Sequence, residues 1–285
     1  MTAYVLALGS ALLYGTGDFL GGLTARRASA LLVVALGQLA GLLVLLLLVA
    51  WFRPATPEAR DIAWGAVAGL CGGGGVALLY RALAIGTMSV VAPVTAVCAV
   101  AVPVLWDVAM GDRPGPQATA GILLAVVAIV LVSQAPVALM KDRPPRPFGL
   151  PRGLGPALIS GVLVGGFFLA LARTNAGAGL WPLVSARVTS VTFFAAAMLA
   201  RHESWRVPAS TGLLIVSGGV LDMVANALYL LATRGGPLAS VVTLSSLYPA
   251  STVALARVAL GERIGPVQGA GVAAALVAVA LIVSA

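Results

Sequence analysis

Asp222 lies near the middle of an apolar stretch of the sequence, residues 210–232. Asn226 follows four residues later and Tyr229 three residues after that, so in a helix these side chains share one face. A carboxylate, an amide and a phenol on one face can coordinate a polar solute, and an ionisable residue at membrane depth is retained at a cost of several kcal/mol. The pattern therefore predicts solute binding by all three residues and proton coupling at Asp222. The alternative is a hydrogen-bonded brace between helices.

Arg187 lies roughly two turns into the preceding apolar stretch, 180–200, counted from Trp181. Its guanidinium can snorkel to the membrane interface. Alternatively it faces the interior of a helix bundle, where it binds a substrate carboxylate or pairs with Asp222, and we favour the interior. Gln38 is a weaker candidate for the same interior site.

Asp18 lies four residues after Tyr14 in the first apolar stretch, so these side chains also share a helix face. Two interpretations stay open: Asp18 belongs to a solute site with Tyr14, or it lies at the interface and pairs with Arg26 and Arg27. Hydroxyl groups inside helices often bond their own backbone, so each alone is weak evidence for a site. The hydroxyl candidates for solute binding are Thr95, Ser245, Ser246 and Tyr248.

The stretches that hold these residues are long enough to cross a bilayer. Of the 285 residues, 60% are hydrophobic and 9% are charged, whereas a soluble domain carries roughly 25% charged residues. Segments in lipid must satisfy their own backbone polar groups, and these stretches lack the alternation of barrel strands. We therefore predict an all-α integral membrane fold with ten transmembrane helices, each near the required length of about 20 residues. The predicted spans are 2–20, 30–52, 62–80, 88–110, 116–135, 153–172, 180–200, 210–232, 238–260 and 266–284.

The sequence aligns with itself after a shift of 150 residues. The hexamer 111–116, Gly-Asp-Arg-Pro-Gly-Pro, falls on 261–266, Gly-Glu-Arg-Ile-Gly-Pro. We predict a first five-helix repeat at 1–135, a Pro-rich basic linker at 136–152 and a second five-helix repeat at 153–285. Because each repeat has an odd number of spans, the second copy must enter the membrane inverted. Inverted repeats of this kind are typical of secondary transporters, whose solute site lies near the midplane between the repeats.

Three parts of the chain resemble the EamA branch of the drug/metabolite transporter superfamily. They are 13–19, Leu-Tyr-Gly-Thr-Gly-Asp-Phe; 92–94, Ala-Pro-Val; and 245–250, Ser-Ser-Leu-Tyr-Pro-Ala, with the Gly261-Glu262-Arg263 that follows. The resemblance covers essentially the full length, although Asp112 stands where the family usually has Glu. It implies ten helices in two inverted five-helix repeats around a central cavity. Members of the family move metabolites, amino acids or drugs.

We therefore expect a secondary transporter of small metabolites or drugs that works by alternating access and exports amino-acid-like or amphipathic solutes. A passive channel or a lipid translocator is the alternative. The protein is predicted to be a multi-pass protein of the cell inner (plasma) membrane, a monomer or a homodimer, whose partners are a small-molecule solute and the lipid bilayer. The net charge of +8 does not indicate nucleic acid, because the basic residues lie mainly between spans.

Two arguments give opposite orientations of the chain in the membrane. The family resemblance implies cytoplasmic termini, whereas the count of Lys and Arg in the loops favours the opposite.

The acidic residues Asp112 and Glu262 each precede a Gly-Pro step and a new helix, where we expect them to act as helix caps.

Enzymatic activity is not expected, and neither is a cofactor or a metal. The single histidine, His202, lies in a loop, which argues against a His-metal site or a Ser/His catalytic site. Residues 15–18, Gly-Thr-Gly-Asp, match the Gly-x-Gly-Asp element of intramembrane aspartyl proteases, with Asp222 as a possible second carboxylate. That element lacks the Tyr-Asp motif that those enzymes carry upstream, so the match is weak.

Overall fold

The computed structural model describes residues 2–52, 56–111, 115–133, 152–235, 241, 244–245 and 247–284. Within these ranges the chain forms ten α-helices and one short 3-10 helix, and it contains no strand. The first half holds α1 (Thr2–Thr24), α2 (Ala30–Phe52), α3 (Ala59–Ile85), α4 (Met88–Ala109) and α5 (Pro116–Ser133). The second half holds α6 (Leu154–Ala172), η2 (Ala176–Ala178), α7 (Trp181–Ala200), α8 (Ala209–Gly235), α10 (Tyr248–Leu260) and α11 (Pro266–Val283).

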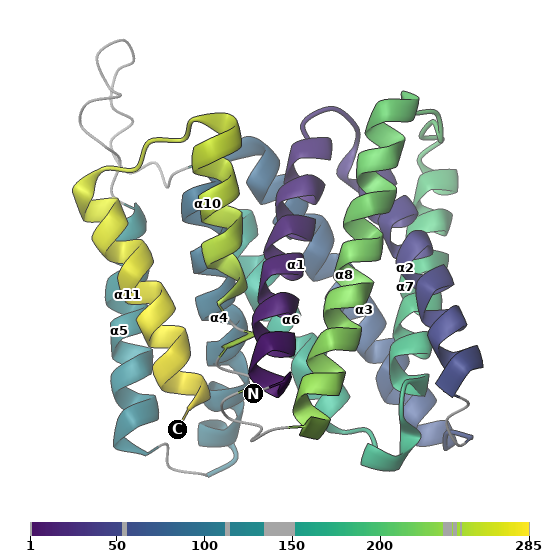
Figure 1. Cartoon of the computed structure of the whole chain (residues 1–285), viewed down its shortest axis with the longest axis horizontal. Helices are drawn as coiled ribbons and strands as arrows, with labels where there is room; N and C mark the ends of the chain where they lie inside the picture. The colour runs from purple at the N-terminus through teal and green to yellow at the C-terminus, as the bar shows by residue number, and fades with distance from the viewer. Residues whose placement is uncertain are drawn as a thin grey trace.

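Equivalent helices of the two halves keep the register of the sequence repeat. α3 and α8 both contain 27 residues, α5 and α11 both contain 18, and the first residues of each pair are 150 positions apart. α5 and α11 lie side by side (Figure 1). They run antiparallel, because Gln117 near the start of α5 bonds Ser284 just after the end of α11. This antiparallel pairing is what an inverted duplication predicts.

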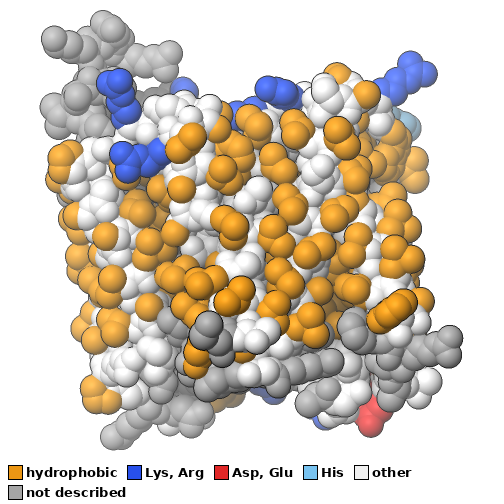
Figure 2. Space-filling view, in the orientation of Figure 1, with side chains coloured by type: hydrophobic (Ala, Val, Ile, Leu, Met, Phe, Trp, Pro, Cys, Tyr) orange, Lys and Arg blue, Asp and Glu red, His pale blue; other side chains and the backbone are white. Residues whose placement is uncertain are grey.

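Arginine side chains gather at one end of the bundle, along the upper edge in Figure 2. The α1–α2 and α7–α8 turns meet there through a hydrogen bond between Ser29 and Glu203. We call this the arginine end. The opposite end, here called the terminal end, holds both chain termini and the α2–α3 and α6–α7 turns (Figure 1). The described arginines at the arginine end are Arg26, Arg27, Arg81, Arg152, Arg201, Arg206, Arg257 and Arg263, against Arg60 and Arg173 at the terminal end.

A large apolar core fills the arginine end. It joins the last turns of α1 and α3 to the first turns of α2, α4, α6 and α8, together with the last turns of α7. Met88, Leu83 and Met198 are fully buried within it. The other core clusters are smaller and lie mainly between pairs or small groups of helices. The two ends of the bundle are therefore packed unequally.

Apolar side chains also cover the outer face of the bundle (Figure 2). Leu47 and Val258, for example, expose 71% and 87% of their surface. A surface of this kind fits lipid and not water. Within the described residues, six helices are long and apolar enough to cross a membrane, and three further apolar helices are shorter. The six are α1, Ala30–Trp51 of α2, α3, α6, α7 and Ala209–Tyr229 of α8.

One sequence expectation is corrected here, the capping role of Glu262. Of the span predicted at 238–260, the structure describes α10, which begins at Tyr248 with Pro249 in its first turn, and a few residues before it. Proline suits a first helical turn because the N–H that it lacks would have no partner there. The acid Glu262 does not cap α11, whose first turn is instead closed by a bond from the Gly265 N–H to Gln268 at 3.2 Å. Glu262 bonds the start of α4.

Candidate functional site

A cavity of about 720 Å³ lies between the two halves. This volume is within the range of roughly 300–1,000 Å³ that is usual for small-molecule sites. Its walls are mainly apolar, and the ionisable side chains Asp18, Arg187 and Asp222 face it beside several tyrosines. Ten of the eleven predicted solute-binding residues line it: Tyr14, Asp18, Gln38, Thr95, Arg187, Asp222, Asn226, Tyr229, Ser245 and Tyr248. The eleventh, Ser246, lies outside the described residues.

Glycines bring α2, α7 and α8 together at this cavity. A methyl group on Gly219 of α8 would overlap the carbonyl oxygen of Gly37 on α2. A methyl group on Gly41, one turn further along α2, would lie 3.5 Å from the Arg187 guanidinium. Small residues permit this close backbone approach between membrane helices. The approach places polar side chains of three helices at one point.

Arg187 is the centre of that polar cluster. Its Nη1 donates to Gln38 Oε1 on α2, and its Nη2 donates to Asp222 Oδ2 on α8, with which it forms an ion pair. The Arg187 side chain is 13% exposed and that of Asp222 is 27% exposed. The snorkelling interpretation of Arg187 is therefore wrong, and the predicted alternative of pairing with Asp222 describes the structure. Charge-assisted bonds of this kind hold both side chains in a defined geometry.

Asn226 and Tyr229 extend the cluster along α8. The Asn226 side-chain amide donates to the carbonyl oxygen of Asp222 at 2.8 Å, across one turn of the same helix. Both residues line the cavity. The predicted shared face of Asp222, Asn226 and Tyr229 is thus present, and it points to the cavity.

Asp18 enters the cavity from α1, on the same helix face as Tyr14. Its interfacial pairing with Arg26 and Arg27, one of the two interpretations above, is not formed. Arg26 instead contacts Glu262 at 3.7 Å. Among the described residues, Asp18 makes no hydrogen bond and no ion pair of its own. It is a carboxylate without a compensating cation in a mainly apolar cavity.

Three tyrosine rings line the cavity together with Asp18. Tyr14 and Tyr248 contact each other edge to face, with ring centroids 6.3 Å apart. Tyr80 of α3 packs against Gly21, one turn beyond Asp18. Tyr14, Tyr80 and Tyr248 all line the cavity and all lie within electrostatic range of the Asp18 carboxylate. Together the three rings and the carboxylate form an aromatic and anionic wall.

Two residues of this site were missed by reasoning from the sequence. Tyr80 lies on the cavity face of α3, two helical turns after Gly73. This spacing puts both residues on one face of the helix, and it was the signal in the sequence that could have identified Tyr80. Ser190 lies three residues after Arg187 on α7, also toward the cavity. Its hydroxyl oxygen is buried and has no hydrogen-bond partner among the described residues. A buried polar group without a partner is uncommon in proteins.

The hydroxyl groups of Thr95 and Ser245 bond backbone carbonyl groups elsewhere in the chain. Thr95 donates to the carbonyl oxygen of Ala157 at 3.3 Å, and Ser245 donates to that of Ala7 at 3.4 Å. Both bonds join neighbouring helices, as polar side chains often do in membranes. Their contact with a solute stays a prediction.

The family of the chain follows from comparison with known proteins. The family model described as the EamA-like transporter family matches residues 1–134 and 151–284, two segments 150 positions apart. The chain belongs to the EamA-like transporter family. The resemblance seen in the sequence is thereby confirmed, and with it the two-repeat architecture of a multi-pass membrane protein. A crystal structure described only as that of a protein is similar in fold, with a TM-score of 0.64 and 17% identity over 98% of this chain and 95% of that chain. Comparison with curated proteins gave no match.

Membership in a transporter family also bears on the enzyme question. EamA-like proteins are transporters and not enzymes. The aspartyl-protease alternative needs two carboxylates that share one proton. Here Asp222 is engaged by Arg187, so the two cavity carboxylates do not form a free dyad. In the described part of the chain, no group of three or more His, Cys, Asp or Glu residues is placed to hold a metal ion.

Proposed function

We propose that this EamA-like protein is a secondary transporter of small amphipathic solutes that carry an ammonium group. The observation that supports this solute class is the unpaired carboxylate of Asp18. In the described part of the chain, the charged groups that line the cavity are two carboxylates and one guanidinium, and Arg187 already neutralises Asp222. Asp18 is therefore the carboxylate left for a cation to balance, because burial disfavours its ionised form until a cation pairs with it.

The aromatic wall supports the same class. An ammonium group is attracted to the faces of tyrosine rings and to a carboxylate, and the energy of a cation–π contact rises as water is removed. Tyr14, Tyr80 and Tyr248 provide such rings in the cavity that Asp18 also lines. The rest of the wall, which includes Val76, Phe167 and other apolar side chains, suits a hydrophobic body. Amphipathic amines and amino-acid-like solutes have both features.

Arg187 offers a second point of attachment. An amino-acid-like solute brings a carboxylate that can replace Asp222 as the partner of the guanidinium, which binds carboxylates in a fork geometry. Protonation of Asp222 would release Arg187 for this exchange. This is how we propose that proton coupling at Asp222 works, with proton uptake and solute binding linked through one arginine.

Alternating access is the proposed transport cycle. Inverted repeats with a solute site between them are the usual basis of such cycles. The cavity lining reaches Thr174 and Gly179 in the α6–α7 turn, but it includes no residue of the α1–α2, α3–α4 or α10–α11 turns. A cavity that reaches one end of the bundle and stops short of the other is expected for one state of a transporter. A passive channel would need a path to both ends.

We further propose that all ten predicted spans cross the bilayer, and that the membrane is the plasma membrane. Six long apolar helices and three shorter ones, Met88–Pro103, Pro116–Leu131 and Pro266–Ile282, make nine candidates among the described residues, and α10 lies within the remaining predicted span, 238–260. Export is the proposed direction of transport.

A ligand-binding screen by thermal stability tests the solute class. Purified protein is heated with a panel of primary amines, quaternary ammonium compounds, amino acids and neutral isosteres. A ligand at a hundred times its dissociation constant stabilises the protein by about 2.7 kcal/mol. Stabilisation by ammonium compounds and not by their neutral isosteres is expected, and it should be lost in Asp18→Asn. Stabilisation by neutral or anionic compounds alone would refute the proposed solute class.

A further inference from the structure

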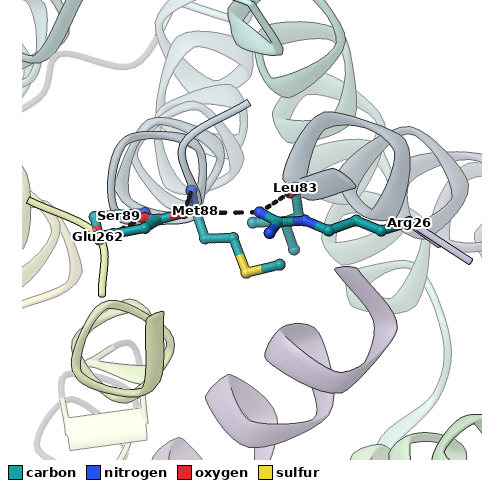
Figure 3. A network of polar contacts seen from close by, with 5 residues as sticks. All are labelled: Arg26, Leu83, Met88, Ser89 and Glu262. Atoms are coloured by element: carbon teal, nitrogen blue, oxygen red, sulfur yellow. Dashed lines mark hydrogen bonds and ion pairs between the residues drawn. The ribbon is translucent and has the colours of Figure 1, made fainter. Parts of the chain in front are cut away.

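A polar network at the arginine end joins the two repeats. Glu262, in the α10–α11 turn, accepts hydrogen bonds at 2.9 Å from the backbone N–H groups of Met88 and Ser89 and from the Ser89 hydroxyl. Figure 3 shows the carboxylate against the first turn of α4. A carboxylate at a helix N-terminus satisfies free N–H groups and meets the positive end of the helix dipole. A residue of the second repeat thus caps a helix of the first.

Arg26 extends this network to two more elements. From the α1–α2 turn its Nη2 lies 3.7 Å from Glu262 Oε1 and donates to the carbonyl oxygen of Leu83, at the end of α3, at 3.4 Å (Figure 3). The Glu262 side chain is only 12% exposed and that of Arg26 is 32% exposed. The ends of α1 and α3, the start of α4 and the α10–α11 turn are therefore tied at one point.

The repeat-related positions cannot build the same network. With the shift of 150 residues, Arg26 corresponds to Ala176, Ser89 to Ala239 and Glu262 to the shorter Asp112. The cation and the hydroxyl are both replaced by alanine. The second contact between repeats at the arginine end, Ser29 with Glu203, is lost as well, because its counterparts are Gly179 and Arg53. The difference lies in the sequence itself.

Packing beneath the network follows the same asymmetry. The large apolar core lies directly under it and includes Leu83 and Met88. The cavity begins at this core, whose members Val34, Leu79 and Tyr80 line it, and extends toward the terminal end, where Thr174 and Gly179 line it. Among the described residues, the hydrogen bonds between the repeats at the terminal end include those of Asn175 with Glu58 and Asp61 and that of Gln117 with Ser284, and these contain no cation. The end with the network is the closed end.

We propose that Arg26, Ser89 and Glu262 form a latch that holds the arginine end closed, and that the lack of a matching cation and hydroxyl in the sequence of the repeat-related positions makes the state open toward the terminal end the resting state. The latch rests on the proposed alternating-access function and specifies how that cycle is biased. In a symmetric inverted duplication the two end states would be equally favoured. A cation and a hydroxyl that the repeat-related positions lack, together with the longer of the two carboxylates, remove this equality.

The test uses cysteine labelling in detergent and needs no solute. In a background with Cys71 and Cys98 replaced by alanine, a reporter is placed at Val91→Cys, fully buried beneath the latch, or at Thr174→Cys, at the open mouth of the cavity. The latch variant Glu262→Gln removes the charge and keeps the size. Glu58→Gln is the matched control at the terminal end. Arg26→Gln is a second latch variant that leaves the α4 cap in place.

Each outcome decides the proposal. We expect both latch variants to label Val91→Cys about tenfold faster, which is 1.4 kcal/mol in the closed-to-open equilibrium, and to label Thr174→Cys more slowly, with no such change in Glu58→Gln. Unchanged labelling of Val91→Cys in both latch variants would overturn the latch. Faster labelling of Val91→Cys without slower labelling of Thr174→Cys would mean local loosening and would also overturn it. Because no solute is present, either failure leaves the proposed transport function standing, and a missing transport activity would not alter the labelling result.

Discussion

The Arg187 guanidinium of α7 and the Asp222 carboxylate of α8 form an ion pair inside the cavity, although 35 residues separate them in the chain. The Gln38 amide oxygen completes the coordination of the guanidinium from α2. Three helices from both repeats therefore meet at one cation. Asp18 on α1 lacks any such partner among the described residues, and this contrast between the two carboxylates underlies the proposed solute chemistry.

Breaking the ion pair from one side should destabilise the fold. Arg187→Gln leaves Asp222 without its counter-ion, and we expect a loss of about 2 kcal/mol in unfolding free energy, below the 3–5 kcal/mol of a fully buried pair because the cavity admits water. The double variant Arg187→Leu with Asp222→Leu should recover much of the loss. Denaturant unfolding in detergent measures both. Equal loss in the single and the double variant would contradict this account of the pair.

Replacing Asp18 should have the opposite effect on stability. Asp18→Asn removes a charge that has no partner in the described structure, so we expect the melting temperature of the solute-free protein to stay unchanged or to rise. The measurement is a melting curve of the purified variant beside Asp222→Asn, which should melt lower because it leaves Arg187 uncompensated. A strong loss of stability in Asp18→Asn would show that Asp18 is a structural residue.

The close approach of α2 and α8 should depend on Gly219. Gly219→Ala places a methyl group against the carbonyl oxygen of Gly37, so the helices must separate and the Arg187 cluster must open. We expect a loss of about 1–3 kcal/mol from overpacking. Gly166→Ala is the matched control, since its nearest neighbour would be the Cys71 sulfur at an ordinary 3.5 Å. Similar melting temperatures for the two variants would argue against this role of Gly219.

The arginine end should face the cytoplasm. Eight described arginines lie there and two lie at the terminal end, and short loops rich in Lys and Arg remain on the cytoplasmic side. This conflicts with the orientation that the family resemblance implied. In intact cells, an impermeant maleimide should label Thr56→Cys in the α2–α3 turn and spare Ser204→Cys in the α7–α8 turn. The reverse pattern would support the family orientation.

The sequence predicted those features that depend on local pattern. The repeat shift of 150 residues gives the matching bounds of α3 and α8, and the i, i+4 spacing predicts the shared face of Asp222 and Asn226. Which of two partners a charged side chain meets depends on packing between distant helices. For that reason two environments were possible for Arg187. Nothing in the sequence indicated that Glu262 caps α4, because Glu262 and Ser89 lie 173 residues apart in the chain.

Uptake into proteoliposomes tests the central claim most directly. Protein reconstituted into vesicles is given the radiolabelled ammonium compound that stabilises it most, and initial uptake is compared between the wild type, Asp18→Asn and empty vesicles. We predict saturable uptake by the wild type and at least about a tenfold reduction in Asp18→Asn, which corresponds to the loss of 1.4 kcal/mol of solute interaction. Saturable uptake that is unchanged in Asp18→Asn would contradict the account, because the unpaired carboxylate would then have no part in recognising the solute.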